Sequence, residues 1–383
     1  MTQNNADTVE LTAFRRALHQ HPEISGEERE TAARIVDALR DWAPDQMLTG
    51  LGGHGVAAIY DSGNPGPTVM IRAELDALPI LELNDLPHAS QTPGKGHLCG
   101  HDGHMTILLG LARILSRRRP AMGRAVLLFQ PAEEDGSGAA AVIADARYAQ
   151  IAPDWALALH NMPGVKLGRA WLAEGAANCA SLGLKITLTG ETAHASTPET
   201  GRAPTSALAR LIDRLHALAP GGVLGPDFRL ATITHLQMGA PAFGIAPGAA
   251  ELWVTPRTLT DEGLDVLLAE VKTCAQTEAD AANLEVDFEI HDHFGACVNH
   301  PEATEILARA LDASGIGFDA GDLPMRASED FGRFGTAGAK AAMLFLGAGK
   351  DHPALHAQSY DFPDDLIPQG VAIFHHAVRQ ILG

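Results

Sequence analysis

Apolar residues follow two spacings along the chain, and each spacing predicts a different kind of element. Residues 8–42 carry them at helical intervals, which predicts two helices separated by the polar segment His19–Glu23. Short continuous apolar runs predict buried strands at about 55–61, 68–75, 125–130 and 155–160, and a longer run predicts a buried helix at 105–115. Alternating strands and helices are typical of an α/β fold. We therefore expect an α/β domain with a central sheet.

The pattern changes between residues 179 and 293. There the predicted order is strand, helix, two strands, helix and strand, at 182–188, 203–218, 229–237, 250–257, 261–283 and 284–291. This β-α-β-β-α-β order is ferredoxin-like and makes a complete small unit. The α/β pattern then resumes, with a helix at 302–313, a strand at 341–347 and a terminal helix at 364–382. We expect residues 1–178 and 294–383 to form one domain, and residues 179–293 to form a second domain inserted into it.

The composition of the 383 residues narrows the range of partners. The formal net charge of −19 argues against binding to nucleic acids or to anionic membrane surfaces. The sequence begins with polar residues, and no apolar run reaches the length of a membrane span. The four cysteines are widely spaced and form no CxxC pair. These features predict a cytoplasmic protein without a nucleic-acid or membrane partner.

The segment His97–His104 concentrates metal-binding chemistry. It holds three histidines, one thiol and one carboxylate within eight residues, and such side chains bind zinc and similar divalent ions. Cys99 and His101 are two residues apart, and the glycines of this turn allow neighbouring side chains to converge on one point. The segment also precedes the helix expected at 105–115, and a helix N-terminus favours anions such as a thiolate. The alternative is a histidine-rich surface turn.

Other candidate ligands follow the predicted strands. Each of three strands is followed by residues that can bind a metal: Asp76, Glu133 with Glu134, and His160. Ligands of α/β proteins bind at the carboxyl ends of strands. Any one of these residues alone could belong to a surface turn, but three strands that deliver such groups together indicate a site. His19 and His21 make a weaker case, because a proline-broken linker between helices is more often structural.

These residues suit a site for two divalent ions. Two ions a few ångströms apart can hold a water molecule, lower its pKa and polarise a carbonyl oxygen. The site also needs one carboxylate that does not bind metal and takes the proton from the water. Glu133 and Glu134 offer that division, because adjacent residues at the end of a strand point in different directions.

Taken together, the motifs resemble the amidohydrolase branch of the aminoacylase-type dinuclear metallopeptidases, which includes hippurate hydrolases and indole-acetyl-amino-acid hydrolases. The resemblance covers nearly the whole chain. It implies that residues 1–178 and 294–383 form a catalytic α/β/α domain with a mixed central sheet, and that the inserted ferredoxin-like domain of residues 179–293 is a lid and dimerisation domain. The motifs of the resemblance are Phe14–Arg16 through His19–Glu23, Arg72–Pro79, Cys99–His104, Phe129–Glu134, Leu159–His160, His194–Pro198, Ser328–Phe331, and Leu355–His356 followed by Tyr360–Phe362. Each motif alone is moderately specific, whereas the ordered set is highly specific.

The resemblance implies roles for individual residues. The metal ligands would be Cys99, His101, Glu134, His160 and His356. Glu133 would be the general base and acid, and Asp76 would support the metal centre from behind its ligands. His194 of the lid would reach the active site of the partner subunit in a homodimer and stabilise the oxyanion of the tetrahedral intermediate. Arg257 would hold a substrate carboxylate, and Gly347, at the end of its strand, is also assigned to substrate binding.

Two positions depart from the family. Glu74 stands where the family usually has aspartate, in a contact behind the metal ligands. The lid segment Phe243–Pro247 replaces an Asn-Val-Ile-Pro run, so that Gly244 stands where an asparagine usually contacts the substrate. The proposed ligands and base are unchanged, so these differences concern the choice of substrate rather than the reaction.

The predicted activity is hydrolysis of the amide bond of an N-acyl amino acid by metal-activated water. Two ions of zinc, manganese, cobalt or nickel per chain could serve, because thiolate, imidazole and carboxylate ligands admit each of them. A dipeptidase or carboxypeptidase with the same two metals is an alternative. A non-catalytic binding protein with a single structural metal is a less favoured one.

Overall fold

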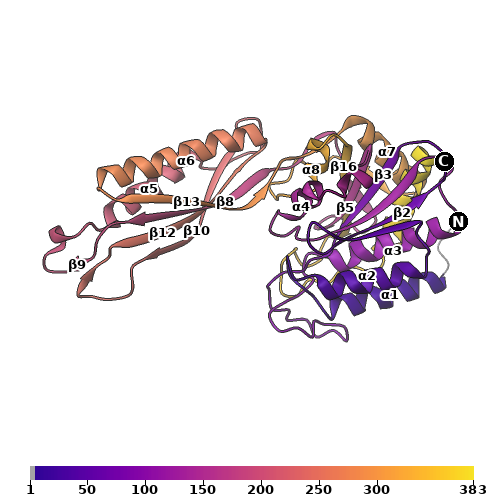
Figure 1. The fold of residues 1–383 in the computed structure, drawn as a ribbon, viewed down its shortest axis with the longest axis horizontal. Helices are drawn as coiled ribbons and strands as arrows, with labels where there is room; N and C mark the ends of the chain where they lie inside the picture. The colour runs from indigo at the N-terminus through magenta and orange to yellow at the C-terminus, as the bar shows by residue number, and fades with distance from the viewer. Residues whose placement is uncertain (1–4) are drawn as a thin grey trace. The chain divides into compact units, whose positions relative to one another are not determined.

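The computed structural model of the protein describes residues 5–383. Contacts within it divide the chain into two compact units. The first consists of the chain up to Ala177 together with Cys297–Leu323 and Asp330–Gly383, and the second of Asn178–Ala296 with Pro324–Glu329. Figure 1 shows helices around a mixed sheet in the first unit and two helices against a sheet in the second. The predicted fold class is confirmed, whereas the predicted residue boundaries of the domains stay a prediction.

An eight-stranded mixed sheet forms the centre of the first unit. Its strands are, in spatial order, β1 (Gln46–Leu51), β2 (Gly55–Asp61), β4 (Arg124–Gln130), β3 (Thr68–Glu74), β5 (Trp155–Pro163), β16 (Lys340–Gly349), β6 (Arg169–Trp171) and β15 (Gly317–Asp319). The neighbours β4, β3, β5 and β16 are parallel to one another. Their carboxyl ends therefore lie at one edge of the sheet, and the segments that leave this edge carry the candidate ligands.

Helices cover the sheet. They are α1 (Asn5–His19), α2 (Arg29–Arg40), α3 (His101–Arg117), α4 (Gly138–Ala144), α7 (Pro301–Ala313), α8 (Gly332–Thr336) and α9 (Leu366–Leu382). Helix α3 contacts α1, α2 and α9, whereas α4 contacts α8. Strands β3, β4 and β5 are buried along nearly their whole length, as expected for parallel strands with both faces covered. Helix α3 is also buried almost all round, which explains its continuous apolar run.

The second unit has the predicted order of elements. These are β8 (Ala180–Thr189), α5 (Thr205–Leu218), β10 (Arg229–Met238), β12 (Ala249–Thr258), α6 (Asp261–Ala281) and β13 (Glu285–Phe294). The sheet is antiparallel in the order β10, β12, β8, β13. Alternate residues of β8 are buried and pack in one core with both helices, so one face of the sheet is covered. Strand β10 lies at the edge, and most of its residues are exposed.

The structure also contains elements that the sequence pattern does not predict. Strand β1 is mostly exposed and lacks an apolar run. Short pairings add β7 (Gly175–Asn178) with β14 (Cys297–Asn299) and β9 (Ala193–His194) with β11 (Ile245–Ala246). Helix α3 begins at His101 rather than at 105, so part of the histidine-rich segment is helical. Within residues 5–383, no helix combines the length and the apolar character needed to cross a membrane.

Candidate metal centre

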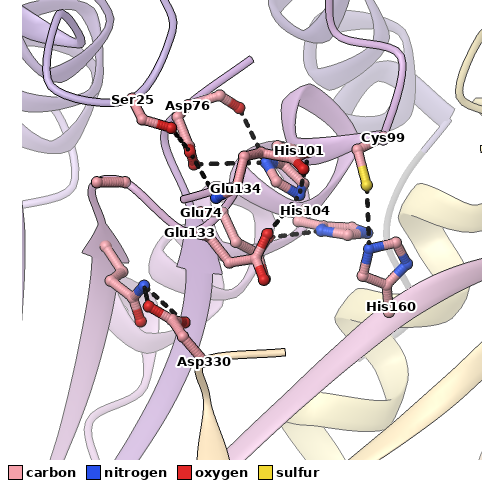
Figure 2. A network of polar contacts seen from close by, with 12 residues as sticks. Ser25, Glu74, Asp76, Cys99, His101, His104, Glu133, Glu134, His160 and Asp330 are labelled. Carbon is pink, nitrogen blue, oxygen red and sulfur yellow. Dashed lines mark hydrogen bonds and ion pairs between the residues drawn. The ribbon is translucent and has the colours of Figure 1, made fainter. Parts of the chain in front are cut away.

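The five side chains expected to bind metal lie together in the first unit. The sulfur of Cys99 and ring nitrogens of His101 and His160 lie within 4.8 Å of one another. Cys99, Glu134 and His356 form a second group whose donor atoms are equally close. In Figure 2 the sulfur of Cys99 points at His160, and Glu134 lies beside His101. Segments separated by up to hundreds of residues in sequence therefore meet at one point.

The distances between these atoms fit shared cations. Cys99 Sγ lies 3.4 Å from His160 Nε2. The two oxygens of Glu134 face different histidines, Oε1 at 3.8 Å from His101 Nε2 and Oε2 at 3.6 Å from His356 Nε2. Two ligand atoms on one tetrahedral zinc ion are roughly 3.5 Å apart, given bonds of about 2.0–2.3 Å. His101 Nε2 is also buried without a hydrogen-bond partner, which is costly unless a cation binds there. The residues therefore fit a divalent metal centre.

Backbone geometry brings these ligands together. Gly100 adopts a φ of 97°, and a Cβ at this position would lie 2.4 Å from Asn161 Oδ1, so only glycine fits between Cys99 and the start of α3. His356 also has a left-handed backbone, with a φ of 65°. Its N–H donates to the carbonyl of Leu98 at 2.8 Å. This bond ties the loop after β16 to the loop before α3, and so places His356 next to Cys99.

Hydrogen bonds fix the orientation of two imidazoles. The Nδ1 atoms of His101 and His160 lie 2.8 Å from the backbone carbonyls of Asp76 and Asn161. Carbonyls only accept, so each Nδ1 carries the hydrogen and each Nε2 is left for the site. The carboxylate of Asp76 accepts from the Glu134 N–H at 2.9 Å and from the Ser25 hydroxyl at 2.7 Å. Asp76 thereby contacts two predicted ligands, His101 and Glu134, but does not itself belong to a group of metal-binding side chains found among residues 5–383.

The sequence pattern predicts that Glu133 and Glu134 lie at the end of a strand. They lie instead in the turn that follows the strand. Strand β4 ends at Gln130, and Ala132 adopts a left-handed φ of 49°, which redirects the chain before the pair. The two carboxylates still occupy different places. Glu134 lies between two histidines, whereas Oε2 of Glu133 lies 3.8 Å from His101 Nε2, and Glu133 is only 5% exposed. Divergence of the two side chains therefore comes from the turn and not from strand geometry.

Burial and charge set the protonation of the cluster. Burial, together with the negative charges of Glu134 and Glu133, raises the pKa of the Cys99 thiol well above its usual value. Burial and the charge of His104 lower the pKa of His160 to about 3. Burial alone would lower the pKa of His101, but Asp76 and other carboxylates outweigh it and raise the value to about 10. Cation binding would displace the protons of Cys99 and His101, as is usual for metal sites with such ligands.

Of the three predicted substrate-binding residues, His194 and Arg257 belong to the second unit and Gly347 to the first. His194 is exposed in the second unit, where its Nδ1 lies 2.8 Å from the Ser196 hydroxyl oxygen. Arg257 belongs to the same unit and donates to the carbonyl of Arg326 and the hydroxyl of Ser328, both at 2.5 Å. Gly347 belongs to β16, and a Cβ there would lie 2.3 Å from the carbonyl oxygen of Lys166. Their roles in substrate binding stay predictions.

Sequence reasoning missed a buried polar network behind the ligands. His104 contacts Glu74 and Asn161, and Glu74 contacts Arg72. The only sequence signal is that His104 lies one helical turn after His101, on the same side of α3. Its partners come from β3 and β5, far away in sequence, so their proximity depends on the order of strands in the sheet.

Comparisons with known proteins agree with this geometry. A sequence profile described as Peptidase family M20/M25/M40 matches residues 70–380. The chain is 30% identical to N-acetyldiaminopimelate deacetylase of Leuconostoc citreum, over 94% of this chain and 92% of that protein. It is 29% identical to hippurate hydrolase of Campylobacter jejuni, over 95% and 94%. Its fold matches the crystal structure of a dinuclear metal-binding peptidase of the M20 family from Bacillus subtilis, with a TM-score of 0.82, 24% identity and 99% coverage of both chains.

Proposed function

The chain belongs to peptidase family M20/M25/M40 and is a metal-dependent amidohydrolase, and from this premise we propose that its substrates are N-acyl amino acids. The observation that carries the proposal is the convergence of five metal-binding side chains beside one further buried carboxylate, that of Glu133. The named activities of the two relatives support it, since a hippurate hydrolase and an N-acetyldiaminopimelate deacetylase both act on amides formed by an amino group and a carboxylic acid.

The metals would be held by the ligands already described. Cys99, His101, Glu134, His160 and His356 offer one thiolate, three imidazoles and one carboxylate, and the position of Glu134 between two histidines supports a pair of ions. Zinc suits this mixture, and manganese, cobalt and nickel are compatible with it. When bound, divalent cations supply the electrophilic assistance of the reaction: they polarise the acyl carbonyl and make a nearby water more acidic.

We assign the proton transfers to Glu133. Its carboxylate takes a proton from the attacking water as the oxygen forms a bond to the acyl carbon. It then gives this proton to the amide nitrogen as the carbon–nitrogen bond breaks. The products are a carboxylic acid and an amino acid. The burial of Glu133 and the 3.8 Å distance between its Oε2 and His101 Nε2 support this role, because a group that takes the proton of the water has to lie beside the ligands.

We further propose a homodimer in which His194 serves the partner's active site and stabilises the developing oxyanion. Two observations support this arrangement. His194 is exposed and is not part of any group of metal-binding side chains found among residues 5–383. Strand β10 offers an exposed edge that carries the apolar residues Leu236 and Met238, and exposed edges of this kind pair readily with a second chain. Arg257, anchored to Arg326 and Ser328, and Gly347 complete the proposed substrate site.

A cytoplasmic location belongs to the same proposal. All four cysteines are free thiols, as expected for a protein of a reducing compartment. Subcellular fractionation of the native host would test it, and recovery of the protein outside the cytoplasm would contradict it.

A substrate panel tests the proposed function. The metal-free protein is reconstituted separately with zinc, manganese, cobalt and nickel, and incubated with N-acetyl, N-benzoyl and indole-acetyl amino acids and with dipeptides. Release of the free amino acid from one or more N-acyl substrates, lost again on chelation, is the expected result. Cleavage of dipeptides alone would instead favour a dipeptidase. One tightly held ion per chain, with no turnover of either class, would favour a binding protein.

A further inference from the structure

His104 is a buried histidine of the first unit that does not belong to the proposed ligands. It is 2% exposed and lies in the first turn of α3. Its Nδ1 lies 2.6 Å from Glu74 Oε2, and its Nε2 lies 2.6 Å from Asn161 Oδ1 and 3.3 Å from the Asn161 N–H nitrogen. Distances of 2.6 Å are those of direct hydrogen bonds and leave no space for a cation. Both ring nitrogens are therefore committed to the protein.

Asn161 connects His104 with the metal centre. It follows His160 on β5, and its backbone carbonyl accepts the Nδ1–H of His160 at 2.8 Å. Its side-chain Nδ2 donates to the Tyr360 hydroxyl at 2.6 Å. The pairing of β5 with β3 ends at Ala158, so on that side Asn161 is held by side chains rather than by a strand ladder. The carbonyl that orients His160 thus sits on a residue clamped by His104 and Tyr360.

The other side of His104 is anchored to the sheet. Glu74 forms an ion pair with Arg72, whose guanidinium also donates to Asp330 Oδ1 at 2.5 Å and to Gln130 Oε1 at 2.9 Å. Figure 2 shows Glu74, His104 and His160 following one another toward Cys99. All residues of this polar network are buried. Buried polar networks whose members have their hydrogen-bond partners are rigid. On this side His104 is therefore held in place by Glu74, which Arg72 fixes in turn.

We propose that His104 is a positioning residue of the metal centre: its Nε2 side clamps Asn161, which holds the His160 ring in the orientation that faces Cys99. This inference rests on the proposed function only in taking His160 and Cys99 as metal ligands. Groups behind metal ligands commonly set their orientation and affinity. The Glu74–His104 pair is then an anchor for a ligand rather than a metal site of its own.

Two matched substitutions separate the two sides of the ring. His104→Asn places an amide near the Nδ1 position, facing Glu74, and removes the group that holds Asn161. His104→Gln places an amide near the Nε2 position and keeps a partner for Asn161. The probe is Co²⁺ alone, added to each metal-free protein. Affinity is measured by titration, and the absorption bands of the cobalt ion and of its bond to the thiolate report the surroundings of the ion and the presence of Cys99.

We expect His104→Asn to bind the first Co²⁺ about 10–100-fold more weakly than the wild type with altered bands, and His104→Gln to stay within about threefold of it. The midpoint of thermal unfolding of the metal-free proteins shows that both variants are folded. Wild-type affinity and bands in His104→Asn would overturn the proposal. Equal losses in both variants would also overturn it, because the ring would then only fill space.

A second variant keeps the proposal testable if His104→Asn does not fold. Tyr360→Phe removes only the hydroxyl at the other end of the Asn161 clamp and should weaken Co²⁺ binding in the same direction. Unchanged affinity in this variant would count against the clamp. The outcome is independent of the substrate panel: a protein that binds Co²⁺ through Cys99 but hydrolyses no N-acyl amino acid contradicts the proposed function and leaves the role of His104 standing.

Discussion

At the scale of single residues, Glu133 and Glu134 show how one turn gives two neighbours different surroundings. The oxygens of Glu134 face His101 and His356, whereas Glu133 is largely buried with its Oε2 at 3.8 Å from His101 Nε2. The carboxylate of Glu134, between two histidines, is suited to bind cations, and the neighbouring carboxylate of Glu133 is suited to accept and donate a proton. The left-handed Ala132 that precedes them makes this division possible.

Glu133→Gln tests the proton transfers. The amide keeps the size of the side chain but cannot accept the proton of water, so we expect kcat to fall by about 10²- to 10⁴-fold at unchanged metal content. Steady-state kinetics and elemental analysis of the metals are the measurements. Asp135→Asn is the matched control, because it removes a charge in the same turn. The Asp135 carboxylate accepts a hydrogen bond from the N–H of Ser137, which the amide oxygen of asparagine can also accept. Near-normal turnover in Glu133→Gln would show that another group is the base.

At the scale of elements, the start of α3 depends on close packing as well as on its ligands. A Cβ at Gly103 would lie 2.4 Å from atoms of the buried Phe362 ring. The ring belongs to the segment that follows His356, so the two chain segments that carry ligands also pack against each other here. The sequence places glycine at this point because the helix approaches the ring too closely for any side chain.

Gly103→Ala should therefore lower stability although alanine is the better helix former. The helical preference favours alanine by about 1 kcal/mol, whereas overpacking of a rigid core costs about 1–3 kcal/mol and the clash here is severe. We expect a net loss of about 1–2 kcal/mol in the free energy of unfolding, measured with urea. Gly225→Ala is the control, since a Cβ there meets nothing within 4 Å. Equal stability of both variants would mean that Phe362 moves aside freely.

Helix α1 is joined to α3 by a buried ion pair that depends on pH. His19, the last residue of α1, has its Nδ1 at 2.8 Å from Asp102 Oδ2 and its Nε2 at 3.2 Å from Glu82 Oε1. Burial alone would lower the pKa of His19, but Asp102 and Glu82 outweigh it, and the pKa is raised to about 9. The folded state therefore binds the proton more tightly than the unfolded chain, in which the pKa is about 6.5.

The sign of the effect on stability follows from this difference. The contribution of His19 is complete below pH 6.5, falls as the pH rises and is gone above pH 9, with a full size of about 3 kcal/mol. The difference in free energy of unfolding between the wild type and His19→Gln should shrink over this range, as measured by urea unfolding at several pH values. His216→Gln, at an exposed position of α5, is the control. A constant difference from pH 6 to pH 9.5 would contradict the ion pair.

Single elements also show what could be predicted from the sequence. Strand β2 has its predicted bounds, and β3 and β4 differ from theirs by a residue, because continuous apolar runs mark buried strands. The exposed edge strand β1 has no such run and was beyond prediction. The gathering of the predicted ligands followed from their positions after parallel strands. The contacts of His104 could not be predicted in this way, because they depend on the order of β3, β4 and β5 in the sheet.

At the scale of the whole molecule, the five predicted metal ligands belong to one unit, whereas His194 and Arg257 belong to the other. The first unit would therefore hold the metals and the base, and the second would contribute groups that meet the substrate. In the proposed dimer, each active site combines groups from two chains. This division makes the assembly testable by mixing inactive proteins.

Glu133→Gln and His194→Ala should each be inactive alone but recover activity when their dimers are dissociated and reassembled together. A mixed dimer has one site with both residues intact, so random reassembly should restore roughly a quarter of the wild-type activity per chain. Activity is followed on an N-acyl substrate, and sedimentation confirms the dimer. Reassembly of each variant with itself is the control. A mixture that stays inactive while forming dimers would contradict the role of His194 in the partner's site.

The position of strand β5 along its neighbours decides whether the proposed metal site can form. His160 and Asn161 are consecutive, and they pair with Phe345 and Leu346 of β16. Sliding β5 by one position would move either Asn161 into the place of His160 or His160 into the place of Asn161, so that His160 would no longer meet the thiol, since neighbours on a strand alternate in direction. A sheet with β5 out of register would then lack a predicted ligand and should not bind the cations. Uptake of metal during refolding therefore reports, without any substrate, that the central strands have found their native alignment.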